Sequence, residues 1–192
     1  MDILFILDPF DSLKPKKETS IAMMRAAVAR GHRVFGCLQG DISLDQGKVT
    51  ARVTPLELTG ELSPWYKAGE VRIEPLSAFD AVLMRKDPPF DMEYVYSTYM
   101  LERAVEQGAR VYNNPAAIRD HNEKFSITAY PQLTTDVMVT RDPARLREFV
   151  ARHGEAVLKL LDGMGGASIF RARQDDPNLS VILETMNRFG TR

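Results

Sequence analysis

Residues 159–173 read Lys-Leu-Leu-Asp-Gly-Met-Gly-Gly-Ala-Ser-Ile-Phe-Arg-Ala-Arg, and residues 163–166 hold three glycines. Glycine has no Cβ, so its backbone reaches positive φ easily and lets N–H groups approach a ligand closely. Several converging N–H groups form an anion-binding concavity, for which phosphate is the usual ligand. The stretch therefore predicts a phosphate-binding loop. A tight turn that binds nothing is an equally good interpretation of an isolated glycine cluster.

The segments on both sides of the glycines indicate which kind of phosphate loop to expect. Residues 156–161 are a short apolar run typical of a buried strand, and residues 168–173 largely alternate between polar and apolar. Dinucleotide-binding and Walker loops need glycines that open a helix, whereas these glycines lie between two predicted strands. A glycine hairpin between strands is the other known cover for nucleotide phosphates. Lys159, just before the loop, would place an ammonium group beside the phosphates.

Length and composition limit the class of protein. The chain has 192 residues, of which 44% are hydrophobic, and this predicts a globular protein with a packed core. The formal net charge of −1 gives no indication of a nucleic-acid or membrane surface, and no apolar run is long enough to span a membrane. The single cysteine, Cys37, lies in an apolar run and predicts a packed thiol. We therefore expect a cytoplasmic protein.

The histidines do not suggest a metal centre or a nucleophilic enzyme. His32, His121 and His153 lie far apart and have no ligand-like spacing to a cysteine or a carboxylate. The sequence therefore predicts neither a zinc site nor a nucleophile–histidine pair.

The first part of the chain predicts an open α/β domain with a mostly parallel sheet. Residues 2–7 predict a buried strand, residues 19–30 a helix and residues 33–38 a second strand. Strand, helix and strand in this order form a βαβ unit, which implies parallel pairing. A hairpin insertion with a turn at residues 45–47 follows, and residues 81–84 predict a further buried strand.

A charged loop after residues 81–84 is the second feature that indicates a ligand. Arg85, Lys86 and Asp87 precede two prolines at the carboxyl end of a predicted parallel strand, where ligands of open α/β sheets bind. Two adjacent cations on a rigid strand end form a rim suited to a carboxylate. Residue chemistry alone favours the alternative, a capped loop with solvated charges.

A helix is predicted over residues 92–107, with Asp91 as its N-cap. One side of this helix is predicted to carry Met92, Val95, Tyr96, Tyr99 and Met100. The densely polar residues 120–124 then predict a linker. We therefore expect a first domain over residues 1–121 and a second unit over residues 122–192.

Residues 122–192 predict a smaller α+β unit around the glycine loop. A strand is predicted over residues 136–140, and Asp142-Pro143 predicts the start of a helix. A unit of this size buries little apolar surface alone.

Five runs closely resemble bacterial glutathione synthetase, a family of ATP-grasp ligases. The runs are Asp8-Pro9, Val82 to Tyr94, Asn122-Glu123-Lys124, Val139-Thr140-Arg141 and Lys159 to Gly166. The similarity follows the whole chain in order and without evident gaps, so it is far more specific than a glycine cluster. It implies an α/β fold, in which an open, mostly parallel N-terminal domain precedes the first part of an α+β ATP-grasp domain.

The resemblance also implies a reaction and its partners. ATP phosphorylates the C-terminal carboxylate of γ-glutamylcysteine, and the amine of glycine attacks the acyl phosphate to give glutathione, ADP and phosphate. Mg²⁺ accompanies the ATP, and family members are oligomeric, so a homo-oligomer is expected.

The resemblance assigns candidate site residues. The ATP-binding set is Lys124, Lys159, Asp162, Gly163, Met164, Gly165 and Gly166, and the loop part of it closes over the phosphates. Such a lid excludes water, which matters because an acyl phosphate hydrolyses readily. Arg85, Lys86 and Asp87 would help to line the peptide-substrate pocket.

Two departures from the family follow. Leu160 stands where the family usually has proline, so a modest change in loop order is expected. Family members continue well beyond the position of Arg192, and that further part holds the Mg²⁺ ligands and the cations that receive the phosphate. We therefore expect no metal ligand in this chain, no catalytic residue that can be assigned with certainty, and no turnover by these 192 residues alone. The alternatives are another ATP-grasp carboxylate–amine ligase and a non-catalytic nucleotide-binding fragment.

Overall fold

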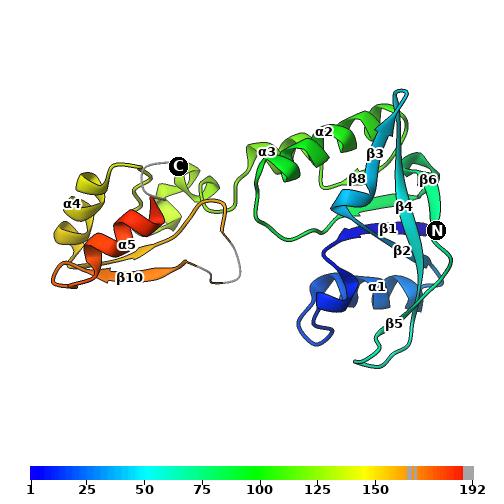
Figure 1. The fold of residues 1–192 in the computed structure, drawn as a ribbon, viewed down its shortest axis with the longest axis horizontal. Coiled ribbons are helices and arrows are strands. Elements are labelled where there is room, and N and C mark those ends of the chain that lie inside the picture. Colours follow the sequence, from blue (N-terminus) through cyan, green and yellow to red (C-terminus); the bar gives the residue numbers. More distant parts are fainter. Residues whose placement is uncertain (164–165, 167, 188–192) are drawn as a thin grey trace. The chain divides into compact units, whose positions relative to one another are not determined.

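The computed structural model of the protein describes residues 1–163, 166 and 168–187. The chain divides into two compact units, Met1–Asp120 and His121–Arg192 (Figure 1). Each unit has its own buried apolar core, so the two are described separately. In the part of the chain described, no helix combines the length and apolarity needed to cross a bilayer.

Unit 1 is built on a sheet with four parallel strands. They are β1 (Asp2–Leu7), β2 (Arg33–Leu38), β7 (Ala81–Met84) and β8 (Val111–Tyr112), in the spatial order β2-β1-β7-β8. Helix α1 (Thr19–Ala29) connects β1 to β2. The predicted βαβ start and the mostly parallel sheet are thereby confirmed.

The central strand β1 is buried on both faces of the sheet. Successive side chains of a strand point to opposite faces. Accordingly, Leu4 and Ile6 lie in the core cluster that includes α2 (Met92–Glu106), whereas Phe5 and Leu7 lie in the cluster that includes α1. Helices on both faces explain why β1 is a continuous apolar run rather than an alternating one.

An antiparallel extension widens the sheet beyond β2. Strands β3 (Ile42–Asp45) and β4 (Lys48–Leu58) form the predicted hairpin, and Gln46 and Gly47 in its turn have positive φ angles of 46° and 80°. Strands β5 (Tyr66–Ala68) and β6 (Arg72–Pro75) also pair with β4. Our sequence interpretation predicted no strand at residues 66–68. It missed β5 because pairing with β4, rather than a local pattern, forms this strand.

Side chains pack closely around Gly36 in the middle of β2. A Cβ there would lie 2.6 Å from Cζ of Phe10 and 3.0 Å from Cδ1 of Leu56. We expect Gly36→Ala to lower the free energy of unfolding by about 1–3 kcal/mol, because the added methyl group overpacks the core. Urea denaturation measures this change. Gly40→Ala is the matched control, since a Cβ at Gly40 meets nothing within 4 Å; equal losses in the two variants would refute the steric explanation.

Helix α2 begins at its predicted cap, where Oδ1 of Asp91 accepts a hydrogen bond from the Tyr94 N–H at 3.0 Å. Near its other end, α2 contacts α3 (Pro115–Asp120), because Arg119 pairs with Glu102 at 2.8 Å.

The buried face of α2 differs from the predicted one. Its buried residues are Tyr94, Ser97, Thr98, Leu101 and Ala104. Met92, Tyr96 and Tyr99, which were predicted on a common apolar side, are 56%, 50% and 50% exposed. The pattern misled because Ser97 and Thr98 donate their hydroxyl groups to carbonyls of the same helix, at 2.9 and 2.6 Å, and so tolerate burial.

The described residues of unit 2 form a two-stranded antiparallel sheet and two α-helices. The strands are β9 (Glu155–Leu158) and β10 (Phe170–Arg173), and the helices are α4 (Pro143–His153) and α5 (Leu179–Met186). Its core consists of Val150, Leu158, Ala172, Leu179 and Leu183. Helix α4 starts as predicted, with Oδ1 of Asp142 accepting from the Ala144 N–H at 2.9 Å.

The strand predicted over residues 136–140 was wrong. This segment is assigned to no strand and pairs with none in the part of the chain described, and Val137 and Val139 are 42% and 45% exposed. Apolar alternation shows which face of a strand would be buried, but a strand also needs a hydrogen-bonding partner, which a local pattern cannot supply.

Candidate functional site

The arrangement of unit 1 brings several polar residues to one edge of the sheet. From β1 the chain first passes to β2 on one side and later to β7 on the other, so the carboxyl ends of β1 and β7 lie at a topological switch point. Ligands of open α/β sheets bind in the crevice at such a point. Asp8 follows β1, and Arg85, Lys86 and Asp87 follow β7.

Arg85 is held at this edge by two hydroxyl groups. Its Nε donates to Oγ of Ser20 at 3.2 Å, and its Nη2 donates to Oγ1 of Thr19 at 2.8 Å. Both partners belong to the first turn of α1, and Ser20 is fully buried. A guanidinium group has five N–H donors. No described residue accepts a hydrogen bond from Nη1, so one edge of the guanidinium remains available to a ligand.

Lys86 is already paired. Its Nζ lies 2.6 Å from Oδ1 of Asp8 and donates to the backbone carbonyl of Asp87 at 2.7 Å. The other oxygen of Asp8 accepts from the Asp87 N–H at 2.8 Å, so one carboxylate joins the ends of β1 and β7. Of the two adjacent cations in the predicted rim, Lys86 is therefore neutralised, and Arg85 carries the available charge.

Asp87 lies in an acidic setting. Burial raises the pKa of its carboxyl group, and the carboxylates of Asp8 and Glu18 raise it further, which outweighs the lowering by Lys86 and Arg85. Its carboxyl group therefore stays protonated to a higher pH than that of an ordinary surface aspartate.

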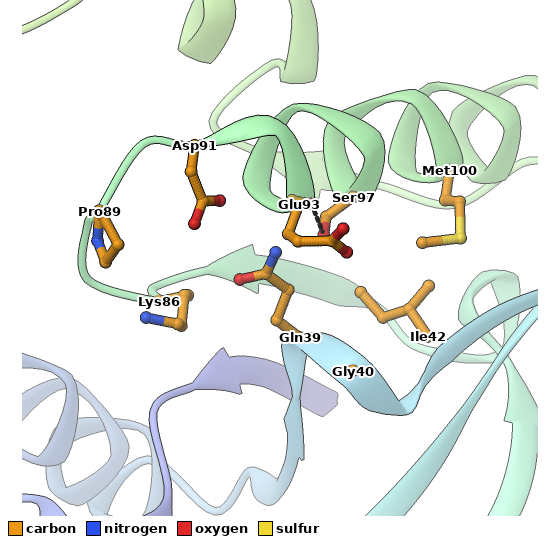
Figure 2. Close-up of a pocket in the computed structure, with 9 residues that line it drawn as sticks. All are labelled: Gln39, Gly40, Ile42, Lys86, Pro89, Asp91, Glu93, Ser97 and Met100. Carbon is orange, nitrogen blue, oxygen red and sulfur yellow. Dashed lines mark hydrogen bonds between the residues drawn. The ribbon is translucent and has the colours of Figure 1, made fainter. Parts of the chain in front are cut away.

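A cleft of about 400 Å³ adjoins this loop. It is lined by Gln39, Gly40, Ile42, Lys86, Pro89, Asp91, Glu93, Ser97 and Met100. Figure 2 shows the side chains of Gln39 and Glu93 extending toward each other, with Ile42 and Met100 together at one end. A cleft of this volume with mixed polar and apolar walls suits a small organic ligand such as a peptide.

The glycine loop of unit 2 connects two strands that pair with each other. The antiparallel pairing of β9 with β10 confirms the prediction of a loop between two strands. The strands are shorter than predicted, because β9 ends at Leu158 and β10 begins at Phe170. Gly166 has a φ of 80°, which glycine adopts easily. Met164 and Gly165 lie outside the described residues.

Two residues of the polar segment before the loop contact its first part. Nζ of Lys124 donates to the carbonyl of Gly163 and lies 2.8 Å from Oε1 of Glu123. Nδ2 of Asn122 donates to the carbonyl of Leu161 at 3.0 Å. Oδ1 of Asn122 also accepts from the Lys124 N–H at 3.0 Å, so Asn122 fixes the backbone at Lys124. The structure thus brings together Lys124 and Gly163, two of the residues predicted to bind ATP.

Lys159 was predicted within the strand that precedes the loop, but it directly follows the shorter β9, and it is exposed. Within the described part of the chain it forms no ion pair, unlike Lys86 and Lys124. Asp162 is half-buried in the same loop. An exposed ammonium group beside a loop of glycines can receive an anionic ligand without first breaking an internal salt bridge.

The structure also gives roles to residues to which the sequence assigned none, although Asp8 and Asn122 lie in runs that resemble the family. Thr19, Ser20 and Asp8 order the Arg85 loop, and Asn122 orders the start of the glycine loop. Among the residues described, no group of three or more His, Cys, Asp or Glu side chains could hold a metal ion.

Two family descriptions match the chain, one for each unit. "Prokaryotic glutathione synthetase, N-terminal domain" matches residues 1–119, and "Prokaryotic glutathione synthetase, ATP-grasp domain" matches residues 123–192. The chain belongs to the prokaryotic glutathione synthetase family. The resemblance predicted from the sequence is thereby confirmed.

Relatives within the glutathione synthetase family are longer than this chain. The glutathione synthetase of Ralstonia nicotianae is 53% identical over 192 residues, which are 100% of this chain and 59% of that protein. The chain therefore spans about three fifths of the length of this relative.

Solved structures share the fold at low sequence identity. D-cycloserine synthetase DcsG superposes with a TM-score of 0.62 at 16% identity, covering 97% of this chain and 55% of that one. The ATP-grasp ligase PsnB, solved with a phosphomimetic variant of its minimal precursor, Mg and ADP, gives a TM-score of 0.50 at 16% identity, covering 97% and 61%. At this identity the likeness shows the fold alone, and it agrees with the predicted α/β domain followed by an ATP-grasp part.

Proposed function

We propose that this chain supplies the nucleotide- and dipeptide-binding part of a glutathione synthase, which joins γ-glutamylcysteine to glycine with ATP. The observation that carries the proposal is the match of both units, in order, to the two glutathione synthetase domains. In the proposed reaction, an oxygen of the cysteinyl carboxylate attacks the γ-phosphorus of ATP, and ADP leaves. The amine of glycine then attacks the acyl carbon, and phosphate leaves as the amide bond forms and the nitrogen loses a proton.

The dipeptide site is proposed at the switch point of unit 1. Arg85 would bind a carboxylate of γ-glutamylcysteine through Nη1 and the free hydrogen of Nη2, since a guanidinium fork matches a carboxylate in geometry. Lys86 lines the adjoining cleft, whereas Asp87 is not among its lining residues. Both would hold the shape of the dipeptide site, because both are bound to Asp8.

The nucleotide site is proposed in unit 2. Lys159 would bind the phosphates as a point charge, and Lys124 would act from the segment that contacts Gly163. The loop Asp162 to Gly166, which includes Met164, Gly165 and Gly166, would cover the phosphates and exclude water from the acyl phosphate. Mg²⁺ would enter with ATP as its counter-ion, and we assign it no ligand among the residues described.

The assembly and the location of the protein form part of the proposal. We expect a homo-oligomer in the cytoplasm, with no nucleic-acid or membrane partner. The exposed side chains Met92, Tyr96 and Tyr99 of α2 give unit 1 an apolar face for self-association. Sedimentation of the protein with and without Tyr96→Glu tests this face; a monomeric wild-type protein would contradict it.

Omitting each substrate in turn tests the proposed function. We expect a protein extended to the length of its relatives to release phosphate only when ATP, Mg²⁺, γ-glutamylcysteine and glycine are all present. The 192 residues alone are expected to release none. Phosphate release that does not require the dipeptide would refute the proposal. A higher kcat/KM with another peptide acceptor would identify a different ATP-grasp ligase.

A further inference from the structure

We infer that Thr19 and Ser20 are positioning residues that orient Arg85 toward a carboxylate of the peptide substrate, and that Asp8 fixes the loop that carries it. The inference rests on the proposed function, and it adds three residues that the sequence did not assign to the site, although Asp8 lies in a run that resembles the family.

Two hydrogen bonds order the side chain of Arg85 before a ligand binds. A free arginine side chain samples many rotamers, and a ligand that binds it must pay for the lost freedom. Here two hydrogen bonds, to Ser20 at 3.2 Å and to Thr19 at 2.8 Å, orient the guanidinium plane before any ligand arrives. Ser20 is itself fixed, because it is fully buried and its N–H donates to Oε1 of Glu18 at 2.9 Å. The site is therefore preorganised.

The hydrogen-bond partners of Arg85 are neutral hydroxyl groups. Hydroxyl oxygens accept hydrogen bonds from Arg85 without cancelling its positive charge. The charge of the neighbouring Lys86, in contrast, is neutralised, because the carboxylate of Asp8 lies 2.6 Å from its Nζ. The carboxylates of Glu18 and Asp87 lie on adjoining segments, but neither accepts a hydrogen bond from this guanidinium among the described contacts. The loop thus uses Lys86 to hold its shape and keeps the charge of Arg85 for a ligand.

The backbone on both sides of Arg85 is also held in place. Its own N–H donates to the carbonyl of Ile6 at 2.9 Å, which continues the pairing of β7 with β1. Two residues later, the Asp87 N–H donates to Asp8 at 2.8 Å. The backbone is therefore tied to the end of β1 on both sides of the guanidinium, and Asp8 is the side chain that completes this connection.

The test uses steady-state kinetics of the protein extended to the length of its relatives. Thr19 is exposed, so Thr19→Val removes the hydroxyl group without disturbing the core. We expect Thr19→Val with Ser20→Ala to raise KM for γ-glutamylcysteine about tenfold and to leave KM for ATP unchanged, because a poorly oriented group loses binding at one substrate only. Thr19→Ser alone keeps both hydroxyl partners of Arg85, so this variant is expected to retain the wild-type KM for γ-glutamylcysteine. Thr50→Val is the matched control, since Oγ1 of Thr50 forms a hydrogen bond with Oγ of Ser43 in the hairpin, at 3.2 Å, and with no other side chain in the described part of the chain.

A double-mutant cycle separates positioning from direct contact. If Thr19 and Ser20 act through Arg85, their replacement in an Arg85→Ala background is expected to change KM for the dipeptide no further. An added tenfold rise in that background, or an unchanged KM in the wild-type background, would overturn the inference. Wild-type turnover is measured first, because a protein that does not use γ-glutamylcysteine would overturn the proposed function instead.

Discussion

Replacing Lys159 with methionine is expected to lower kcat/KM for ATP by about 10²–10³-fold in the protein extended to the length of its relatives. Methionine keeps most of the apolar stem and removes the ammonium group. The effect should be large because a cation beside developing phosphate charge acts with greatest strength when a closed loop excludes water. Lys159 forms no ion pair with the described residues, so its loss should leave stability almost unchanged.

Lys67→Met is the control for this substitution. Lys67 is also exposed, but it pairs with Glu57 at 3.2 Å in unit 1, far along the chain from the glycine loop. Its replacement is expected to leave nucleotide affinity unchanged. An equal ATP affinity in the Lys159→Met protein and the wild type, measured by titration calorimetry, would remove the role proposed for Lys159.

Replacing Arg85 with alanine is expected to raise KM for γ-glutamylcysteine by about 10–100-fold, since hydrogen bonds between charged groups contribute about 1.5–3 kcal/mol. The value of KM for ATP should change little. The free energy of unfolding should fall by about 1 kcal/mol, because the buried hydroxyl group of Ser20 loses its donor, whereas Thr19 is exposed.

Replacing Lys86 with methionine is expected to affect stability more, and dipeptide binding less, than Arg85→Ala does. The side chains of Lys86 and Asp8 are only 19% and 24% exposed, so breaking the pair leaves a largely buried carboxylate without its cation. We expect a loss of about 1–3 kcal/mol in the free energy of unfolding, less than for a fully buried pair. Any rise in KM for the dipeptide should be smaller than that of Arg85→Ala. The reverse ranking, with normal stability in Lys86→Met, would show that Lys86 binds the substrate.

The sequence could predict those parts of the fold that local patterns determine. The strands at residues 2–7, 33–38 and 81–84 are short apolar runs bounded by turn residues, and all three lie in the parallel sheet. The caps at Asp91 and Asp142 were also predictable, because a capping carboxylate bonds an N–H two or three residues away.

Features that depend on a distant partner could not be predicted in this way. Strand β5 exists because β4 pairs with it, and residues 136–140 are not a strand because the described chain offers them no partner. The face of α2 was misassigned for a related reason. Ser97 and Thr98 look like surface residues in the sequence, but their hydroxyl groups are satisfied within the helix.

In the candidate site, too, local sequence predicts some residues, whereas others depend on distant partners. Arg85 could be selected from the sequence because it follows a buried strand. Its positioning partners could not, since Thr19 and Ser20 lie 66 and 65 residues away, and Asp8 is 79 residues from Asp87. Asn122 lies within a run that resembles the family, but only its hydrogen bond to Leu161 shows what the side chain does.

The fate of a carboxylate oxygen tests the proposed chemistry most directly. The extended protein is given ATP, Mg²⁺, glycine and γ-glutamylcysteine labelled with ¹⁸O in its cysteinyl carboxylate, and the phosphate produced is examined by mass spectrometry. Because that oxygen attacks the γ-phosphorus and leaves with phosphate when glycine attacks, we expect each phosphate released to carry one ¹⁸O atom. Phosphate without label, formed at the rate of glutathione, would contradict an acyl phosphate intermediate and with it the proposed function.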